Sequence, residues 1–168
     1  MQSTTEVAVH RSISVPLAPR RAFDLFTARM TEFWPREHSI GSSEIAEVVI
    51  EPRTGGRWYE RGVDGSECDW GQVAGWQPPD AVVLLWQLGA NWQYDPELKT
   101  EIEVTFTEEP GGRTRVDLRH RHLERYGDQA ETMRDLFASP EGWHTTLARF
   151  VEAAATAAAA ATDEAAGA

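Results

Sequence analysis

Three side chains of this sequence have the type and spacing that suit chemistry: two histidines and one glutamate. His120 and His122 stand one residue apart in residues 113–123, where apolar and polar residues alternate. Side chains at positions i and i+2 of a strand lie on the same face, so both histidines are expected on the inward, apolar face. Glu60 follows Trp58 at the same spacing, and a carboxylate is rarely buried without a cause. Such groups could act as general acid and base inside a pocket.

The same residues could bind a metal, with His120 and His122 as a chelating pair and Glu60 as a third ligand. No fourth ligand is evident in the sequence, so we expect no metal and no cofactor. The G-x-S-x-G, P-loop and Rossmann glycine motifs are also missing from the sequence. Cys68 is the single cysteine, which excludes an internal disulfide and a cysteine-based zinc site.

Tryptophan is unusually frequent, with seven in 168 residues. A small domain can pack two or three tryptophans in its core, so the excess suggests that some of them line a cavity. We expect a pocket with aromatic walls and a few polar groups, formed by Trp58, Glu60, Trp70, Trp86, His120, His122 and Trp143. A tryptophan buried in the core and a hydrogen-bonded structural histidine remain the alternatives at these positions.

The elements that would position these residues follow from the apolar patterns. Seven strands at hairpin spacing predict one antiparallel sheet, with strands at residues 6–15, 44–51, 57–61, 67–76, 81–88, 99–107 and 113–123. A short helical hairpin is expected after the first strand, in residues 18–34. A long helix is expected over residues 128–158, and only this helix can cover one face of the sheet, which gives an α+β fold. Ser139, as a cap, and Pro140 are expected to begin or kink a helix there.

The length of the chain fits one domain, which we place at residues 1–158. Residues 159–168 are rich in alanine and are predicted to form a disordered tail. The net charge of −11 argues against nucleic acid as a partner, and no stretch approaches the ~20 apolar residues of a membrane span. The N-terminus does not resemble a signal peptide and a free thiol fits a reducing compartment, so a cytoplasmic location is expected. The sheet edges leave a homodimer open.

Five stretches together resemble a known family: VHRSISVPLAPRRAFDLFT, GGRWYER, WGQVAGWQPPDAVVLLW, VTFTEEPGGRTRVDLRHRHLE and GWHTTLARFVEA. In this order they are similar to the START-like (SRPBCC) superfamily, within the branch named for the activator of the heat-shock protein 90 ATPase. The resemblance implies a helix-grip fold, in which a curved antiparallel sheet wraps around a long C-terminal helix and a cavity opens between them. Members of the superfamily include lipid and hormone binders, polyketide cyclases and aromatases, and co-chaperones, so the fold does not fix the function.

Three functions follow from these expectations. The first is binding of a small hydrophobic or aromatic molecule in the tryptophan-lined cavity. The second is an enzyme of the cyclase or aromatase kind, in which Glu60 and His120 would act as acid and base in the same cavity. The third is a co-chaperone-like role, as the name of the branch suggests, although no separate N-terminal module is visible that would grip a large chaperone.

Overall fold

The computed structural model describes residues 7–35, 41 and 43–166 of the chain. The strands are β1 (Val9–Val15), β2 (Ile45–Ile50), β3 (Arg57–Gly62), β4 (Glu67–Gln77), β5 (Ala81–Trp86), β6 (Thr100–Glu109) and β7 (Arg113–Arg121). The helical elements are α1 (Pro19–Thr27), the turn η1 (Met30–Glu32), η3 (Leu123–Gln129), α2 (Ala130–Ala138), the turn η4 (Pro140–His144) and α3 (Thr145–Ala166). The predicted helical hairpin after the first strand is therefore one helix followed by a short turn.

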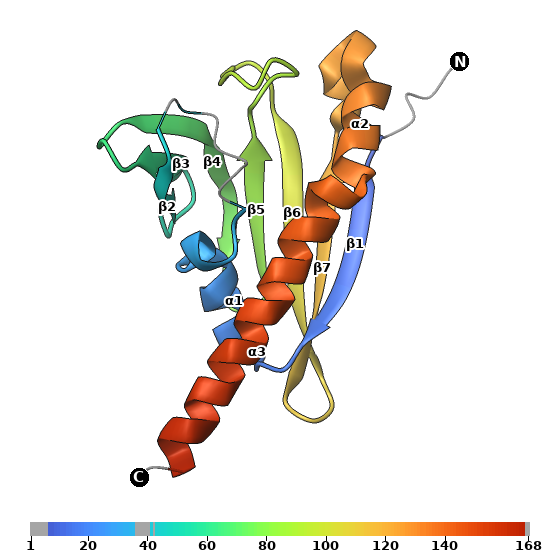
Figure 1. Ribbon diagram of the computed structural model, residues 1–168. Coiled ribbons are helices and arrows are strands. Elements are labelled where there is room, and N and C mark those ends of the chain that lie inside the picture. The colour runs from blue at the N-terminus through green and yellow to red at the C-terminus, as the bar shows by residue number, and fades with distance from the viewer. Residues whose placement is uncertain (1–6, 36–40, 42, 167–168) are drawn as a thin grey trace.

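The seven strands form one antiparallel sheet in the order β1-β7-β6-β5-β4-β3-β2. Figure 1 shows that this sheet curls around α3, which runs diagonally across its concave side. The predicted α+β helix-grip fold is confirmed. The sheet curls because adjacent strands are twisted relative to one another and because bulges in β2 and β4 bend it further.

Strict alternation of apolar residues creates the inner face of the sheet. In β6 and β7, Ile102 and Val104 pair across the strands with His120 and Leu118, and all four residues are buried. The residues between them carry charge and stay outside, as a half-buried strand requires. Removing one such aliphatic side chain from water contributes roughly 1.5–3 kcal/mol, so the pattern itself fixes which face the helix covers.

Phenylalanines join α1 to the sheet and to α3. Phe26 of α1 contacts Phe106 of β6 and Phe150 of α3, with ring centroids 6.0 and 5.5 Å apart. Phe33, after η1, reaches the same Phe150 at 5.0 Å. This packing fills the part of the core around α1, where Trp76 also contacts Phe23, and five of the other tryptophans group with one another.

A kink separates α2 from α3, at the position predicted from Ser139 and Pro140. Gly142 in η4 has φ −88° and ψ −133°, and a Cβ atom there would lie 2.3 Å from the Phe137 carbonyl oxygen. Ser139 was predicted to cap the following helix, but it does not. Its hydroxyl instead donates to the Leu136 carbonyl at the end of α2.

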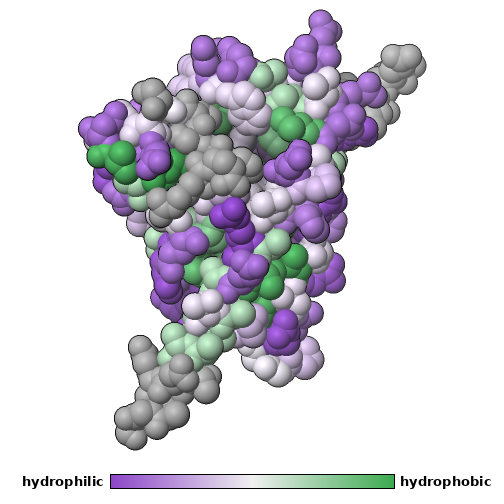
Figure 2. Space-filling view, viewed as in Figure 1, coloured by the Kyte–Doolittle hydropathy of each residue, from purple (hydrophilic) through white to green (hydrophobic). Residues whose placement is uncertain are grey.

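The end of α3 extends past the rest of the ribbon in Figure 1, and a pale green, moderately apolar surface leads toward it in Figure 2. Helical backbone continues to Ala166, beyond residue 158 where the sequence suggests that the domain ends. The division at residue 158 stays a prediction. None of the helices in the described part of the chain is both long enough and apolar enough to cross a membrane.

Candidate ligand site: an aromatic interior

Three neighbouring strands bring three tryptophans to one side of the sheet. Trp58 in β3 pairs with Gly71 in β4, which in turn pairs with Trp86 in β5. The residue after Trp58 pairs with Asp69, so Trp70 is the extra residue of a β-bulge. A bulge changes which residues face inward, and this one turns Trp70 toward the core beside the other two indoles. All three tryptophans are buried.

Two further tryptophans complete a cluster with these three. Trp143, from η4, lies 6.0 Å from Trp86 between ring centroids. Trp34, after η1, contacts the four others, with centroid distances of 4.7 Å to Trp70, 6.3 Å to Trp58, 6.4 Å to Trp86 and 6.0 Å to Trp143. We call these five residues the tryptophan cluster.

Trp34 was missed in the sequence analysis, although it lies at the centre of the cluster. Its signal was its spacing, because Phe26, Met30 and Trp34 continue the apolar stripe of α1 at intervals of four residues. Pro35, directly after Trp34, indicated only that the helix ends there. Phe137 of α2 was also missed, and it contacts Trp86 at 5.7 Å and His120 at 4.5 Å.

His120 lies beside the cluster and is fully buried, as the alternation predicts. The Trp143 indole N–H donates to His120 Nδ1 over 3.1 Å, so the ring proton must sit on Nε2. That nitrogen lies 2.9 Å from Thr100 Oγ1, whose hydroxyl donates in turn to the Trp86 carbonyl at 2.8 Å. Burial lowers the pKa of His120 from 6.5 to about 3. His120 is therefore a neutral histidine at pH 7, and both of its nitrogens are engaged in hydrogen bonds.

Glu60 is also buried, with 2% of its surface exposed. Its carboxylate accepts a 3.0 Å hydrogen bond from the Trp70 indole N–H. The Trp58 indole N–H is buried too, and it has no hydrogen-bond partner within the part of the chain that the structure describes. The cluster thus combines apolar ring faces with a carboxylate and an unused donor, which are the kinds of group that fix the orientation of a ligand.

The expectation that His122 faces inward is wrong. β7 ends at Arg121, and His122 takes a left-handed conformation with φ 62° and ψ 32°, which turns its side chain out of the strand pattern. Its ring is 27% exposed and lies 2.8 Å from a Glu101 oxygen and 3.3 Å from a Glu124 oxygen. Burial alone would raise the pKa of Glu124, but the Val7 N–H and His122 hold it below its usual value.

The arrangement does not unite the predicted metal ligands. His120 bonds Trp143 and Thr100, while His122 bonds two surface carboxylates, and Glu60 bonds Trp70. Among the described residues, no three His, Cys, Asp or Glu side chains group closely enough to hold a metal ion. The remaining chemistry of this interior is stacking on indole faces and hydrogen bonding to a few buried polar atoms.

These features define a helix-grip protein with an aromatic-lined interior. The family model described as "Activator of Hsp90 ATPase homolog 1-like protein" matches residues 16–155, and the chain belongs to this family. No curated protein matches the sequence significantly.

Several solved structures also resemble this chain. An anthrahydroquino-gamma-pyrone synthase, Txn09, is 36% identical over 86% of this chain and 95% of its own, with a TM-score of 0.61. CalC from Micromonospora echinospora, a self-sacrificing resistance protein, is 30% identical over 86% of this chain and 92% of its own, with a TM-score of 0.65. The Aha1 dimer from Colwellia psychrerythraea is 14% identical over 88% of this chain and 96% of that chain, with a TM-score of 0.59, which shows the fold alone.

Proposed function

We propose that this protein binds a flat aromatic molecule of several rings, of the polyketide kind, against the tryptophan cluster. The observation that carries the proposal is the cluster itself: five indoles in mutual contact under one half of the sheet. Indole faces are large and polarisable, and they favour stacked or edge-on contacts with other rings at centroid distances of about 4.5–7 Å. Contacts between the indoles and a fused aromatic ring system could replace contacts between the indoles themselves with little loss of packing.

The buried polar atoms support a ligand with hydroxyl or carbonyl groups. A buried donor without a partner costs roughly 1–3 kcal/mol, and the Trp58 N–H is such a donor within the described chain. A ligand carbonyl oxygen placed near this N–H would remove the cost. The nearby Glu60 carboxylate could accept a hydrogen bond from a phenol.

One relative points in the same direction. The name of the 36% identical synthase refers to a compound with a fused aromatic ring system. The 30% identical resistance protein belongs to the same fold, but its name gives no ligand. The name of the synthase therefore supports an aromatic, polyketide-like ligand more than a fatty acid or a sterol.

Because the indoles already contact one another, a ligand must displace at least one of them from its neighbours. The same packing would also serve as a plain hydrophobic core, so a binding measurement has to separate the two. The probe we choose is 1,8-dihydroxyanthraquinone, an achiral dye with two phenols and two carbonyls. It has no circular dichroism in water and gains a signal in its visible band only when a chiral site holds it in one orientation.

We expect a saturable induced signal with the wild-type protein and about 5- to 10-fold weaker binding to Trp58→Phe, which lacks the free indole N–H. Trp76→Phe is the matched control, because Trp76 contacts Phe23 and lies outside the cluster. Decanoic acid, which is apolar but has no ring, should compete poorly. No induced signal from a folded protein would sink the proposal, and equal losses in both variants would remove the cluster as its site.

A second function, a cyclase-like enzyme, is favoured by one observation: the buried carboxylate of Glu60 beside the cluster. His120 does not suit the acid–base role given to it above, because its depressed pKa keeps it neutral and its nitrogens are occupied. Glu60 would then be the base. Glu60→Gln should abolish turnover of a linear polyketide analogue. Dye binding should weaken only slightly, because the amide oxygen still accepts a hydrogen bond from a phenol. Unchanged turnover would end this alternative.

A further inference from the structure

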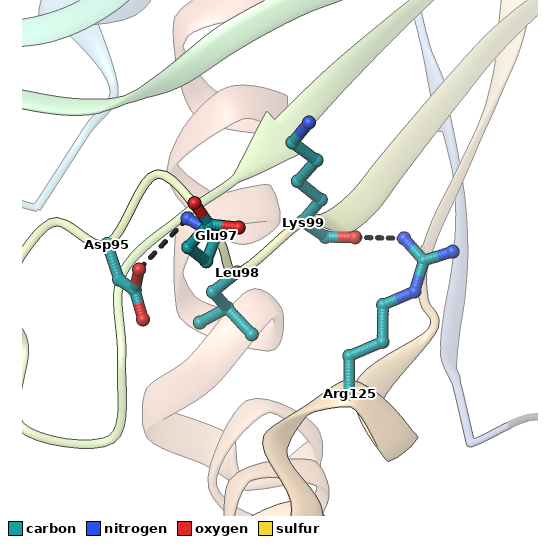
Figure 3. Close-up of a pocket in the computed structure, with 5 residues that line it drawn as sticks. All are labelled: Asp95, Glu97, Leu98, Lys99 and Arg125. Carbon is teal, nitrogen blue, oxygen red and sulfur yellow. Dashed lines mark hydrogen bonds between the residues drawn. The ribbon is translucent and has the colours of Figure 1, made fainter.

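One end of the molecule has a seam where the β5–β6 loop, residues 87–99, meets η3. A pocket of about 560 Å³ lies on this seam, lined by Asp95, Glu97, Leu98 and Lys99 from the loop and by Arg125 from η3. Figure 3 shows the two carboxylates toward one side of the pocket, Arg125 on the other and Leu98 between them. The seam is therefore a place where two separate segments of the chain meet around open space.

Two adjacent residues of η3 hold the two ends of the loop. The Tyr126 hydroxyl donates a 2.6 Å hydrogen bond to the carbonyl of Leu88, at the start of the loop. Arg125 donates through Nη1 to the carbonyl of Lys99, at its end, as the dashed line in Figure 3 marks. Burial raises the pKa of Tyr126 far above its ordinary value, so its hydroxyl stays a donor at any physiological pH.

The aromatic interior begins directly behind this loop. Trp92, in the loop, packs its ring edge-on against Trp86 of the tryptophan cluster, with centroids 6.5 Å apart and an interplanar angle of 85°. Leu98 is 9% exposed and precedes Lys99 and Thr100, and Thr100 bonds the Trp86 carbonyl. A movement of the loop away from η3 would therefore carry Trp92 off Trp86.

Trp92 itself is held in an unfavourable conformation. Its φ is 61°, in the left-handed region that bulky residues rarely adopt, and the residue is 41% exposed. Such outliers persist where the surrounding structure imposes them, and they concentrate at functional sites. Tyr94 of the same loop and Leu136 of α2 are also large, apolar and exposed, and Figure 1 places the loop and α2 at the same end of the molecule.

We propose that the seam is the way in to the tryptophan cluster, and that Tyr126 and Arg125 are positioning residues that keep the β5–β6 loop closed over Trp86. The inference rests on the proposed function for its ligand, but the movement of the loop does not. Opening requires that these two side-chain hydrogen bonds break, that the buried Leu88 and Leu98 of the loop become exposed, and that a strained Trp92 leaves its contact with Trp86. The seam then admits a flat ring system edge-first.

The first test needs no ligand. Exchange of an indole N–H with D2O, followed by NMR, reports how often water reaches that indole. Tyr126→Phe removes one hydroxyl and one end of the clamp, so the Trp86 indole N–H should exchange about fivefold faster, the factor expected for one lost hydrogen bond. Because the Tyr126 hydroxyl also contacts the Trp86 side chain directly, the deeper Trp58 indole N–H must exchange faster as well if the seam opens. The Trp76 N–H, on the other side of the core beside Phe23, should not change.

Tyr59→Phe is the matched control, because it also removes a bonded hydroxyl, one that accepts from Arg61 elsewhere in the sheet. If Trp86 exchanges at the same rate in Tyr126→Phe as in the wild type, or equally fast in the control, the seam is not the route. The second test is stopped-flow association of 1,8-dihydroxyanthraquinone. Tyr126→Phe should raise its association rate about fivefold, with a smaller change in affinity.

The two tests separate the two proposals. Dye that binds the wild type but associates with Tyr126→Phe at an unchanged rate overturns the seam as the way in, while the proposed function stands. Faster Trp86 exchange in a protein that binds no dye supports the opening seam and sinks the proposed ligand class instead.

Discussion

At the scale of single residues, His120 is the buried group whose chemistry the structure fixes most closely. Its neutral ring accepts from Trp143 and lies within hydrogen-bonding distance of Thr100, so a second ring proton would lose the first of these bonds. The same hydrogen bonds that make it a poor acid–base catalyst make it a structural link between η4 and the sheet. Because the link needs a neutral His120, the fold should lose stability as the pH falls.

The pH dependence of stability should carry the signature of His120. Its pKa is about 3 in the folded protein and 6.5 as the ordinary value, so between these two pH values the unfolded chain binds one proton more. The stabilisation is complete above pH 6.5 and declines as the pH falls toward 3, by up to about 1.4 kcal/mol per pH unit. Urea unfolding of wild type and His120→Gln between pH 7 and 4.5 should give curves that converge at low pH. Parallel curves would mean that the pKa of His120 is not lowered in the folded state.

At the scale of elements, the bulge in β4 is the device that brings Trp70 into the cluster. It requires a glycine beside it, because a Cβ atom on Gly71 would lie 1.7 Å from the Leu85 carbonyl oxygen of β5. Gly75, in the same strand, has nothing closer than 3.5 Å around the same position. Two glycines in one strand thus differ in how much room their neighbours leave.

We predict that Gly71→Ala destabilises the protein by about 3 kcal/mol or more, because β4 and β5 would have to move apart. Gly75→Ala should change the free energy of unfolding by less than about 1 kcal/mol, since its new methyl group meets only ordinary contacts. Chemical denaturation of both variants measures the difference. A mild effect at Gly71 would show that the bulge can shift to another residue.

The sequence predicted the elements better than it predicted the details of the site. Each of the seven strands lies within a few residues of its expected place, because alternation and turn residues are local signals. The site depends on non-local features. His122 leaves the strand pattern through a left-handed backbone, and Trp34 joins the cluster from the segment after η1. The periodicity of apolar residues along the sequence predicts neither the left-handed φ angle of His122 nor the contacts of Trp34 across the core.

At the scale of the whole molecule, the two edges of the sheet differ in how they are protected. On β2, the Thr31 hydroxyl both accepts from the Val48 N–H and donates to the Val48 carbonyl, so part of this edge is already covered. β1 lies at the opposite edge and packs near α2 and α3. The homodimer raised by the sequence stays a prediction, and the solved Aha1 dimer shows only that this fold can pair.

The length of α3 that the fold requires can be measured by truncation. Ala154 is fully buried and Ala157 and Ala158 pack against the core, while Arg21 donates to the Ala157 carbonyl at 3.2 Å. A chain ending at residue 158 keeps all of these contacts, so its melting temperature should stay within about 2 °C of the full chain. A chain ending at residue 153 loses three buried or half-buried methyl groups at ~0.8 kcal/mol each, which amounts to about 2 kcal/mol, or ~4–8 °C. Differential scanning calorimetry of both chains distinguishes the cases. If removing residues 159–168 alone lowers the melting temperature as much as the longer truncation does, the alanine-rich end is part of the domain and the boundary at residue 158 is wrong.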